Sequence, residues 1–376
     1  MSRNALRNLP LFDDASHVAE DKEVLQLDEN GLLHTLNQWK TLSALPALRA
    51  AIAEFSSQIR DPRHSLRLNG SGNKHVEFSW DYFLGELSQI AESLTLDRAR
   101  YYVDRLVKGV SEVRTSKIND INLNRWKEYE DIYTDSLWLI DRRDASGAHS
   151  AGYWGNFIPQ IPHQMMRRYT KRGEWVLDTF AGSGTTLIEG QRLGRNTIGI
   201  ELQDRMVEQA KLLVSAESNR YGVTVDVVCG DSTAIDYQAA LAQYGQESVQ
   251  LVVMHPPYFD IIRFSDDPRD LSNASSVDAF LAMLSTVVDK AAQVLDRGRY
   301  LVMVVGDKYA NGEWIPLGFH SMNEVMERGF SLKSIIVKNF EETSGKRNQK
   351  ELWRYRALVG GFYIFKHEYI LVFKKR

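Results

Sequence analysis

The segment from Val176 to Thr186 constrains the fold of this chain more than any other. It reads Val-Leu-Asp-Thr-Phe-Ala-Gly-Ser-Gly-Thr-Thr, so a short apolar run ends in an acid and a loop of small residues opens an amphipathic stretch. Glycines allow a backbone to approach a ligand where a Cβ atom would collide. Open α/β sheets bind ligands beyond the carboxyl ends of their strands. The segment therefore predicts an α/β fold with a ligand-binding loop after its first strand.

Short apolar runs alternate with amphipathic stretches from about residue 150 onward. The predicted helices cover 184–193, 204–217 and 277–295, and the predicted strands cover 175–177, 197–200, 223–228, 249–254 and 300–305. This rhythm is typical of a mostly parallel sheet with helices on both faces. Two later apolar runs, 332–338 and 369–373, predict an antiparallel terminal hairpin.

The first part of the chain has a different pattern. Leu33, Leu36 and Trp39 recur at helical spacing, as do Leu84 and Leu87. We therefore predict two domains. Residues 1–145 form a mostly helical N-terminal domain whose candidate roles are target recognition and partner binding, and residues 146–376 form the domain that holds the loop.

Composition excludes several classes of protein. The chain is 43% hydrophobic and 25% charged, which is typical of a globular protein. No apolar run reaches the roughly 18 residues of a membrane helix. The single cysteine, Cys229, excludes an intrachain disulfide. We expect a cytoplasmic protein without a membrane partner. The formal net charge of −3 means that local basic patches would have to meet any nucleic acid.

The loop does not fit the common phosphate-binding patterns. A phosphate-binding loop of the P-loop type needs a lysine after its last glycine, but Thr185 follows Gly184. A dinucleotide loop needs a third glycine, which is missing here. The carboxylate of Asp178 at the strand end suits a ligand with a positive end. S-adenosylmethionine, which carries an ammonium and a sulfonium group, is such a ligand.

The next two predicted strands also end in acids. Glu201 is placed to accept hydrogen bonds from ribose hydroxyls, as an acid does at this position in dinucleotide folds. Asp231 follows the third strand and can accept from an adenine amino group. Acids at three successive strand ends predict S-adenosyl-L-methionine as the cofactor, and we expect no metal.

The fourth predicted strand runs into His255-Pro256-Pro257-Tyr258. Two prolines after a buried strand make a rigid turn. An aromatic amino nitrogen is a poor nucleophile, and acceptors aimed at its N–H bonds would stabilise the charge that develops on it. The His255 side chain and the Pro256 carbonyl are the candidate acceptors, and Tyr258 would stack on a base flipped out of its helix.

These two motifs carry a family resemblance over roughly residues 150–376. Asp178–Thr186 and His255–Tyr258 resemble motifs I and IV of the amino-methyltransferases of DNA, which act on adenine N6 or cytosine N4 and have a Rossmann-like methyltransferase sheet. Residues 153–162 resemble motif X of this family, which closes over the methionine end of the cofactor. The resemblance implies a set of cofactor-binding residues: Phe157, Pro159, Asp178, Phe180, Ala181, Gly182, Gly184, Thr185, Thr186, Glu201, Asp231 and Ser232.

One residue departs from the family pattern. His255 stands where the family has Asp, Asn or Ser. A neutral imidazole accepts one hydrogen bond, and a protonated imidazole accepts none. We therefore expect activity to fall at low pH. The departure removes the usual indication of the target base, and adenine N6 is only slightly favoured over cytosine N4.

Target recognition needs residues outside the two motifs. Only 68 residues lie between Thr186 and His255, which leaves no room for a recognition domain there. The N-terminal domain and two loops, 259–276 and 340–362, remain. The second loop interleaves aromatic with basic residues, a pattern that suits contact with phosphates and bases. Its predicted nucleic-acid-binding residues are Lys346, Arg347, Lys350, Arg354 and Arg356.

DNA is the predicted partner, and the sequence leaves open a separate specificity or nuclease subunit, as in restriction–modification. Two other functions stay open as well. One is methylation of a guanine amino group in RNA, and the other is a DNA-binding subunit in which His255 marks altered catalysis. Methylation at cytosine C5 is disfavoured, because it needs a cysteine nucleophile and Cys229 lies away from the Pro-Pro turn.

Overall fold

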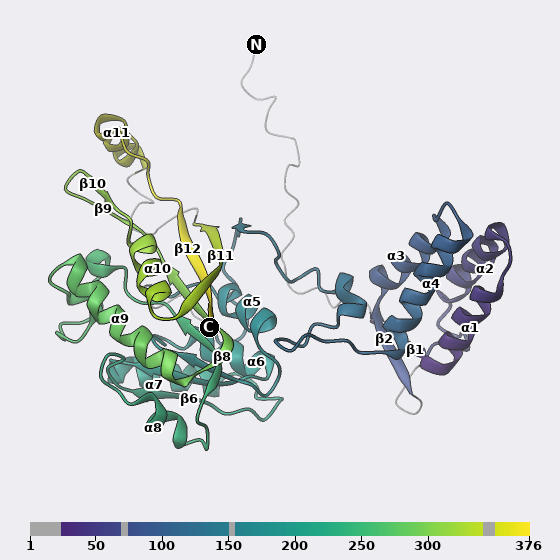
Figure 1. Cartoon of the computed structure of the whole chain (residues 1–376), viewed down its shortest axis with the longest axis horizontal. Coiled ribbons are helices and arrows are strands. Elements are labelled where there is room, and N and C mark those ends of the chain that lie inside the picture. Colours follow the sequence, from purple (N-terminus) through teal and green to yellow (C-terminus); the bar gives the residue numbers. More distant parts are fainter. Residues whose placement is uncertain (1–23, 69–73, 150–154, 341–349) are drawn as a thin grey trace, which may run out of the picture. The chain divides into compact units, whose positions relative to one another are not determined.

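The structure is a computed structural model that describes residues 24–68, 74–149, 155–340 and 350–376 (Figure 1). The described chain divides into two compact units. One holds residues 24–115 and Asn122–Glu130, and the other holds Ser116–Ile121 and Asp131–Arg376. The predicted boundary at residue 145 is therefore too late. The reason is that β3 (Leu137–Trp138) pairs with β11 (Phe330–Asn339) in the large sheet.

The N-terminal unit is mostly helical, as predicted. Its two strands, β1 (Val24–Asp28) and β2 (His75–Ser79), pair antiparallel. The last residue of each strand caps the following helix, because Asp28 accepts a hydrogen bond from the Gly31 N–H and Ser79 accepts one from the Tyr82 N–H. The helices are α1 (Glu29–Thr41), α2 (Leu45–Gln58), α3 (Trp80–Ala91) and α4 (Leu96–Ser111), and the short 3-10 helix η1 (Leu123–Glu128) follows them.

The second unit is built on an eight-stranded sheet in the order β3-β11-β12-β8-β7-β4-β5-β6 (Figure 1). Its parallel part is β8 (Leu295–Val305), β7 (Val249–Met254), β4 (Trp175–Asp178), β5 (Asn196–Glu201) and β6 (Val225–Cys229). The strand β12 (His367–Lys375) is antiparallel to both β8 and β11. This arrangement confirms the α/β class, the mostly parallel Rossmann-like sheet and the terminal antiparallel pair.

Strand β8 shows why the sheet is covered on both faces. Met303 and Val305 pack with α9 (Val277–Val294) in one apolar core, whereas Val302 and Val304 pack with α5 (Gln160–Tyr169) in another. Successive side chains of a strand point to opposite faces, so an unbroken apolar run needs a helical layer on each side. The layers are α5, α6 (Thr185–Leu193) and α7 (Asp204–Ser215) on one face, and α8 (Tyr237–Ala242), α9 and α10 (Leu317–Glu327) on the other.

The predicted strands and helices of this unit are present. Elements that the sequence did not predict include α5, α8, α10, the small hairpin β9 (Lys308–Ala310) and β10 (Glu313–Ile315), and α11 (Lys350–Gly360). The prediction of a loop over residues 340–362 is wrong for its second half, because α11 is a helix. No helix of the described residues has the length and apolar character to cross a membrane.

Gly190 sets how closely α6 lies on β5. A Cβ atom at Gly190 would come within 1.9 Å of the Thr197 hydroxyl oxygen and 2.9 Å of the Thr197 Cβ. We predict that Gly190→Ala lowers the free energy of unfolding by about 1–3 kcal/mol, because the helix that follows the cofactor loop must move off the sheet.

Calorimetry of the full chain measures this change. Gly85→Ala is the matched control, since this exposed helical glycine has no atom within 4 Å of an added Cβ. It should gain about 0.5–1 kcal/mol from helix propensity. A Gly190→Ala protein as stable as the wild type would show that α6 does not approach β5 this closely.

Candidate functional site

A pocket of about 710 Å³ of open space lies at the carboxyl edge of the parallel strands. Nine of the predicted site residues line it together: Phe157, Phe180, Ala181, Gly182, Glu201, Asp231, Ser232, His255 and Pro257. Residues from motifs X, I and IV, far apart in the sequence, therefore share one cavity.

The loop between β4 and α6 has a backbone that only glycine adopts without strain. Gly182 has a φ of 53° and Gly184 a φ of 88°, both in the left-handed region. Gly184 is the N-cap of α6, and a Cβ on it would lie 3.2 Å from the Cβ of Ala210 in α7. The glycines thus let the loop turn sharply between two packed helices and expose the Gly182 backbone to the pocket.

Asp178 lies beneath this loop, fully buried at the end of β4. One carboxylate oxygen, Oδ1, accepts a hydrogen bond from the Phe180 N–H at 2.9 Å. The other, Oδ2, makes no hydrogen bond of ordinary geometry to a described residue, although the Thr186 hydroxyl lies near enough to favour the ionised form. Burial raises the pKa of Asp178 to about 6. The carboxylate therefore lacks a positive partner.

Glu201 is held at the end of β5 with each oxygen on a backbone donor. Its Oε2 accepts from the Gly182 N–H and its Oε1 from the Gln203 N–H, both at 2.9 Å. Burial raises the pKa of its carboxyl group above the usual value. Each oxygen keeps a second lone pair for a ligand hydroxyl. Asp231, the third acid, uses Oδ1 to accept from the Thr233 N–H and hydroxyl.

These residues fit S-adenosylmethionine on their own geometry. The buried Asp178 Oδ2 and the buried Thr179 hydroxyl make no hydrogen bond of ordinary geometry to a described residue, and the Thr186 hydroxyl lies beside Asp178 without such a bond. Buried polar groups are normally paired, so unpaired ones around a glycine loop indicate where a polar ligand binds. Asp178 would hold the methionine end of the cofactor, Glu201 the ribose and Asp231 the adenine.

Several predicted cofactor residues are near the pocket but do not line it. Asp178 is one of them, since it is fully buried beneath the loop. Thr185 and Thr186 are buried in the first turn of α6, and Gly184 precedes them. Pro159 is the N-cap residue of α5. Ser232, which does line the pocket, donates its hydroxyl hydrogen to the Thr179 carbonyl. A direct cofactor contact for these residues stays a prediction.

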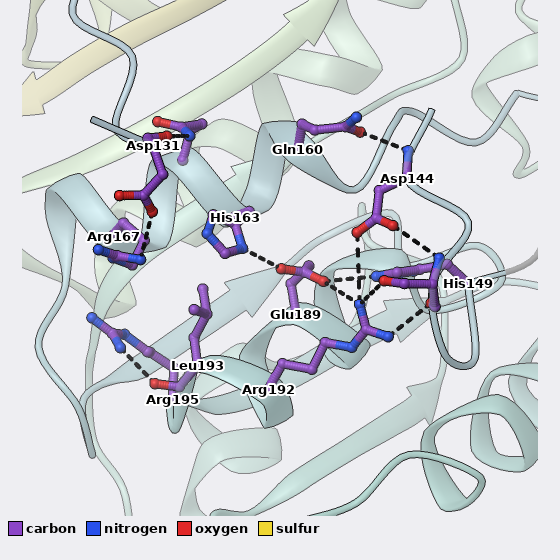
Figure 2. Close-up of polar contacts among 12 residues, drawn as sticks. Asp131, Asp144, His149, Gln160, His163, Arg167, Glu189, Arg192, Leu193 and Arg195 are labelled. Atoms are coloured by element: carbon purple, nitrogen blue, oxygen red, sulfur yellow. Dashed lines mark hydrogen bonds and ion pairs between the residues drawn. The ribbon is translucent and has the colours of Figure 1, made fainter. Parts of the chain in front are cut away.

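The chain that leads to motif X is anchored to α6 (Figure 2). Glu189 of α6 accepts hydrogen bonds from His149 Nε2 and His163 Nδ1, each at 2.7 Å. Burial acts to raise the pKa of Glu189, but the two histidines together outweigh it and lower the pKa to about 2. This pairing fixes the segment just before residue 150 against the helix that follows the cofactor loop. Tyr153 and Trp154 of motif X lie outside the described residues.

The same cluster contains a set of side chains at metal-binding spacing in the described part of the chain. Oxygen and nitrogen atoms of Asp144, His149 and Glu189 all lie within 4.8 Å of one another. The Arg192 guanidinium lies 3.3 Å from Glu189 and 3.8 Å from Asp144 (Figure 2). Arg192 thus supplies the positive charge that these carboxylates need, and ion pairs account for the cluster.

The predicted catalytic turn follows β7 directly. Phe259, just after it, has a φ of 54°, a strained conformation for a residue with a Cβ. The Phe259 ring is buried, and the Lys308 ammonium lies 4.6 Å from its centre. The Pro256 carbonyl accepts no hydrogen bond from the residues that the structure describes. The turn is therefore rigid, and one of its two predicted acceptors is free.

His255 lies between motif X and the rest of the turn. Its ring is 4.8 Å from the Phe157 ring and its Nε2 is 3.0 Å from the Tyr258 hydroxyl. Burial lowers the pKa of His255 to about 4. The neutral form, which can accept a hydrogen bond, therefore persists well below neutral pH. We therefore expect protonation of His255 to reduce activity only near pH 4. A loss of activity near pH 6 would instead be caused by protonation of Asp178.

The loop after the catalytic turn also contributes to the cofactor pocket, which the sequence did not reveal. Residues 259–276 were candidates for target recognition, but Phe264, Arg269, Asp270 and Leu271 line the pocket. Asp270 is buried and accepts from the Ser272 N–H and the Ser265 hydroxyl. An aspartate that caps a short 3-10 turn, Leu271–Asn273, was the signal available in the sequence.

The predicted nucleic-acid-binding residues fall on and before α11. Lys346 and Arg347 lie outside the described residues, and Lys350 begins the helix. Arg354 and Arg356 are exposed on it. The Tyr309 ring of β9 stacks on Phe362 just after α11, with centres 4.2 Å apart. We call residues 308–315 and 350–366 the aromatic arm (Figure 1).

The comparison with known families agrees with this geometry. The chain matches the model of the DNA methylase family over residues 97–212 and 249–376, more than half of its length. The chain belongs to this family, the N6/N4 amino-methyltransferases. The resemblance predicted from the two motifs is thereby confirmed.

Individual relatives match shorter stretches. The Type II methyltransferase M2.DpnII of Streptococcus pneumoniae is 33% identical over 100 residues, 26% of this chain and 34% of its own length. M.MthZI of Methanothermobacter thermautotrophicus is 33% identical over 79 residues, 21% of each chain. M.MjaII of Methanocaldococcus jannaschii is 42% identical over 50 residues, 13% of this chain and 9% of its own. The chain thus matches about a third or less of the length of these relatives.

Solved structures with a similar backbone path include TrmN from Thermus thermophilus. Its TM-score is 0.38 and its sequence identity 15%, and the match covers 59% of this chain and 50% of that one. A methyltransferase from Pyrococcus furiosus has a TM-score of 0.36 and 14% identity over 58% of this chain and 83% of that one.

The raised pKa of Asp178 predicts a pH-dependent affinity for S-adenosylmethionine. Below about pH 6 the free carboxyl group is protonated, whereas the positive methionine end of the cofactor favours the carboxylate. Below pH 6, binding of the cofactor must therefore release a proton. The dissociation constant of the cofactor is constant above pH 6 and rises about tenfold for each pH unit below 6. Calorimetric titration between pH 5 and 8 measures this.

Asp178→Asn should bind more weakly at pH 7.5 and lose the pH dependence, since no proton is exchanged. Asp97→Asn is the matched control, because Asp97 is exposed on α4 in the other unit and should keep the wild-type profile. A profile of Asp178→Asn that still falls below pH 6 would place the titrating group elsewhere.

Proposed function

We propose that this protein is an S-adenosylmethionine-dependent DNA methyltransferase that acts on the exocyclic amino group of a flipped base, with adenine N6 ahead of cytosine N4. One observation carries the proposal. His255 and Pro257 of the Pro-Pro turn line the same pocket as the glycine loop, Glu201 and Asp231. The proposed acceptor His255 and the residues proposed to contact the cofactor therefore line one cavity.

The chemistry follows from this arrangement. S-adenosylmethionine supplies an electrophilic methyl group on its sulfonium. The turn holds the amino nitrogen, with the His255 ring and the Pro256 carbonyl accepting its N–H bonds and so favouring a nitrogen with an available lone pair. As the nitrogen–methyl bond forms, the bond from sulfur to the methyl group would break and leave the neutral thioether S-adenosylhomocysteine. The nitrogen then loses one proton to solvent. Because burial keeps the His255 pKa near 4, this ring acts as an acceptor and not as a proton store.

DNA as the polymer is supported by the family and by the aromatic arm. The arm carries exposed Arg354 and Arg356 beside exposed Tyr355 and Tyr363. Lys308 at its base donates to Asp260, two residues after the catalytic turn. The arm thus combines basic groups that neutralise phosphates with aromatic rings that stack on bases, and it is linked to the predicted target site at Lys308. Our proposal includes a cytoplasmic location and leaves open a separate specificity or nuclease chain.

Methyl transfer to DNA from a host without DNA methylation tests the function. We predict that radiolabelled methyl groups enter duplex DNA, and that nuclease digestion and mass spectrometry identify N6-methyladenine. N4-methylcytosine would keep the reaction class and correct the base. Glu201→Gln should abolish incorporation, whereas the exposed Glu327→Gln on α10 should retain it.

Three results would contradict the proposal. Methylation of RNA guanine and not of DNA would make the protein an RNA methyltransferase. C5-methylcytosine would refute the amino acceptor. DNA binding with cofactor bound but no transfer on any substrate DNA would indicate a subunit with altered catalysis.

The aromatic arm should supply non-specific affinity for the duplex. We predict that the double variant Arg354→Glu, Arg356→Glu weakens DNA binding at least about tenfold and reduces the slope of log affinity against log salt by about 2. Fluorescence anisotropy over a salt series measures both. Arg220→Glu is the control, since exposed Arg220 precedes β6 at the opposite edge of the sheet. An unchanged slope would remove the arm from the DNA interface.

A further inference from the structure

A buried ion pair lies behind the catalytic turn. Lys338 of β11 and Glu368 of β12 are directly opposite each other in the strand register. The Lys338 ammonium donates to Glu368 Oε1 at 3.0 Å, and the two residues are only 6% and 7% exposed. Burying a charged pair is costly, and a pair that was needed only for packing could be replaced by apolar residues. Both side chains share the sheet face on which Ile336 and Ile370 pack.

The pair continues into the catalytic turn through Tyr258. The Tyr258 hydroxyl donates to Glu368 Oε2 at 2.9 Å, and His255 Nε2 lies 3.0 Å from the same hydroxyl. The Tyr258 ring is held in place, since a Cβ on Gly306 would lie 2.9 Å from its Cε2 atom. Four side chains thus form one continuous chain of hydrogen bonds: His255, Tyr258, Glu368 and Lys338.

The hydrogen bonds among these four side chains are consistent with only one placement of the protons. The Glu368 carboxylate, paired with an ammonium, can only accept. Tyr258 has a single hydroxyl hydrogen, which it therefore gives to Glu368, so its oxygen must accept from His255. The hydrogen of the neutral imidazole is then on Nε2. The other nitrogen, Nδ1, keeps its lone pair, since the hydrogen bond of the His255 ring to a described residue is made by Nε2.

We propose that Glu368, acting through Tyr258, fixes the tautomer of His255 so that Nδ1 is the acceptor for the target amino group. This inference rests on the proposed function for its consequence and on geometry for the tautomer itself. Glu368 and Lys338 are positioning residues, since they act through Tyr258 and His255. The lowered pKa of His255 agrees with a ring that is neutral while it works.

The hydrogen bonds from Lys338 to His255 fix a tautomer, which the family's usual residues at this position do not require. The side chains of Asp, Asn and Ser present an acceptor oxygen by simple rotation. A neutral histidine has one acceptor nitrogen, and the tautomer decides which of the two it is. An unconstrained His255 would spend part of its time with Nδ1 protonated, and that form would repel the N–H bonds of the target.

Two substitutions separate this role from simple packing. In Glu368→Gln the amide oxygen turns to Lys338, because an NH₂ group facing an ammonium is unfavourable. The amide then donates to Tyr258, which must donate to His255 Nε2, and the ring changes to the Nδ1–H tautomer. Tyr258→Phe keeps the ring but removes the link, so both tautomers are populated.

Nitrogen-15 NMR of protein labelled at histidine reads the tautomer directly, on the full chain at pH 7 without DNA. The His255 signal is the one lost in His255→Asn. We expect the Nε2–H form in the wild type, the Nδ1–H form in Glu368→Gln and a mixture in Tyr258→Phe. An Nδ1–H wild type, or a Glu368→Gln protein with the wild-type tautomer, overturns the proposal. The wild-type and Tyr258→Phe spectra decide it even if Glu368→Gln fails to fold.

Steady-state methylation then tests the consequence. We expect kcat to fall at least about tenfold in Glu368→Gln and less in Tyr258→Phe, while KM for DNA and the cofactor affinity change less than about twofold. Glu327→Gln is the control. A structural role would instead make loss of the tyrosine hydroxyl at least as harmful as the isosteric Gln. If the wild type transfers no methyl group, the proposed function fails and the tautomer result still stands by itself.

Discussion

The parallel pairing of β4 with β5 on one side and β7 on the other is the constraint on which the site depends. Parallel strands end at the same edge of a sheet, so Asp178, Glu201 and His255 meet although 77 residues separate the first from the last. Gly190 and Gly199 allow α6 and its loop to lie directly on β5. The strand order therefore brings the acids together, and the loop of residues 259–276 completes the lining of the pocket.

The sequence predicted the parallel strands and the loop after β4 well, and the reason is physical. Strands buried on both faces are unbroken apolar runs, and an acid or glycine loop at the end of such a run is conspicuous. The aromatic arm was less visible. Its helix α11 has eleven residues and no buried stripe, because Leu352, Leu358 and Val359 are all exposed. The domain boundary was misplaced because β3 has two residues, too few for any periodicity.

The buried acids of the second unit fall into two electrostatic classes. Glu189, behind the cofactor loop, has two histidines and Arg192 as partners, and its pKa is lowered to about 2. Asp178, under the loop, has one backbone N–H and a pKa raised to about 6. Both carboxylates are almost inaccessible to solvent. The two carboxylates differ in their partners. Glu189 is already paired with positive groups of the protein, whereas Asp178 has no positive partner among the described residues.

The hydrogen bonds that join His255 to Tyr258, Glu368 and Lys338 could not be predicted from the motif alone. Read alone, a histidine in place of Asp, Asn or Ser suggests a weakened site. Its partners lie 83 and 113 residues further along the chain, and only the register of β11 and β12 brings them together. The available signal was a charge on the buried face of each strand, Lys338 beside Ile336 and Glu368 beside Ile370. The proposed role of the buried pair is to select the tautomer of His255, and in that role His255 would replace the usual oxygen acceptor with a nitrogen acceptor.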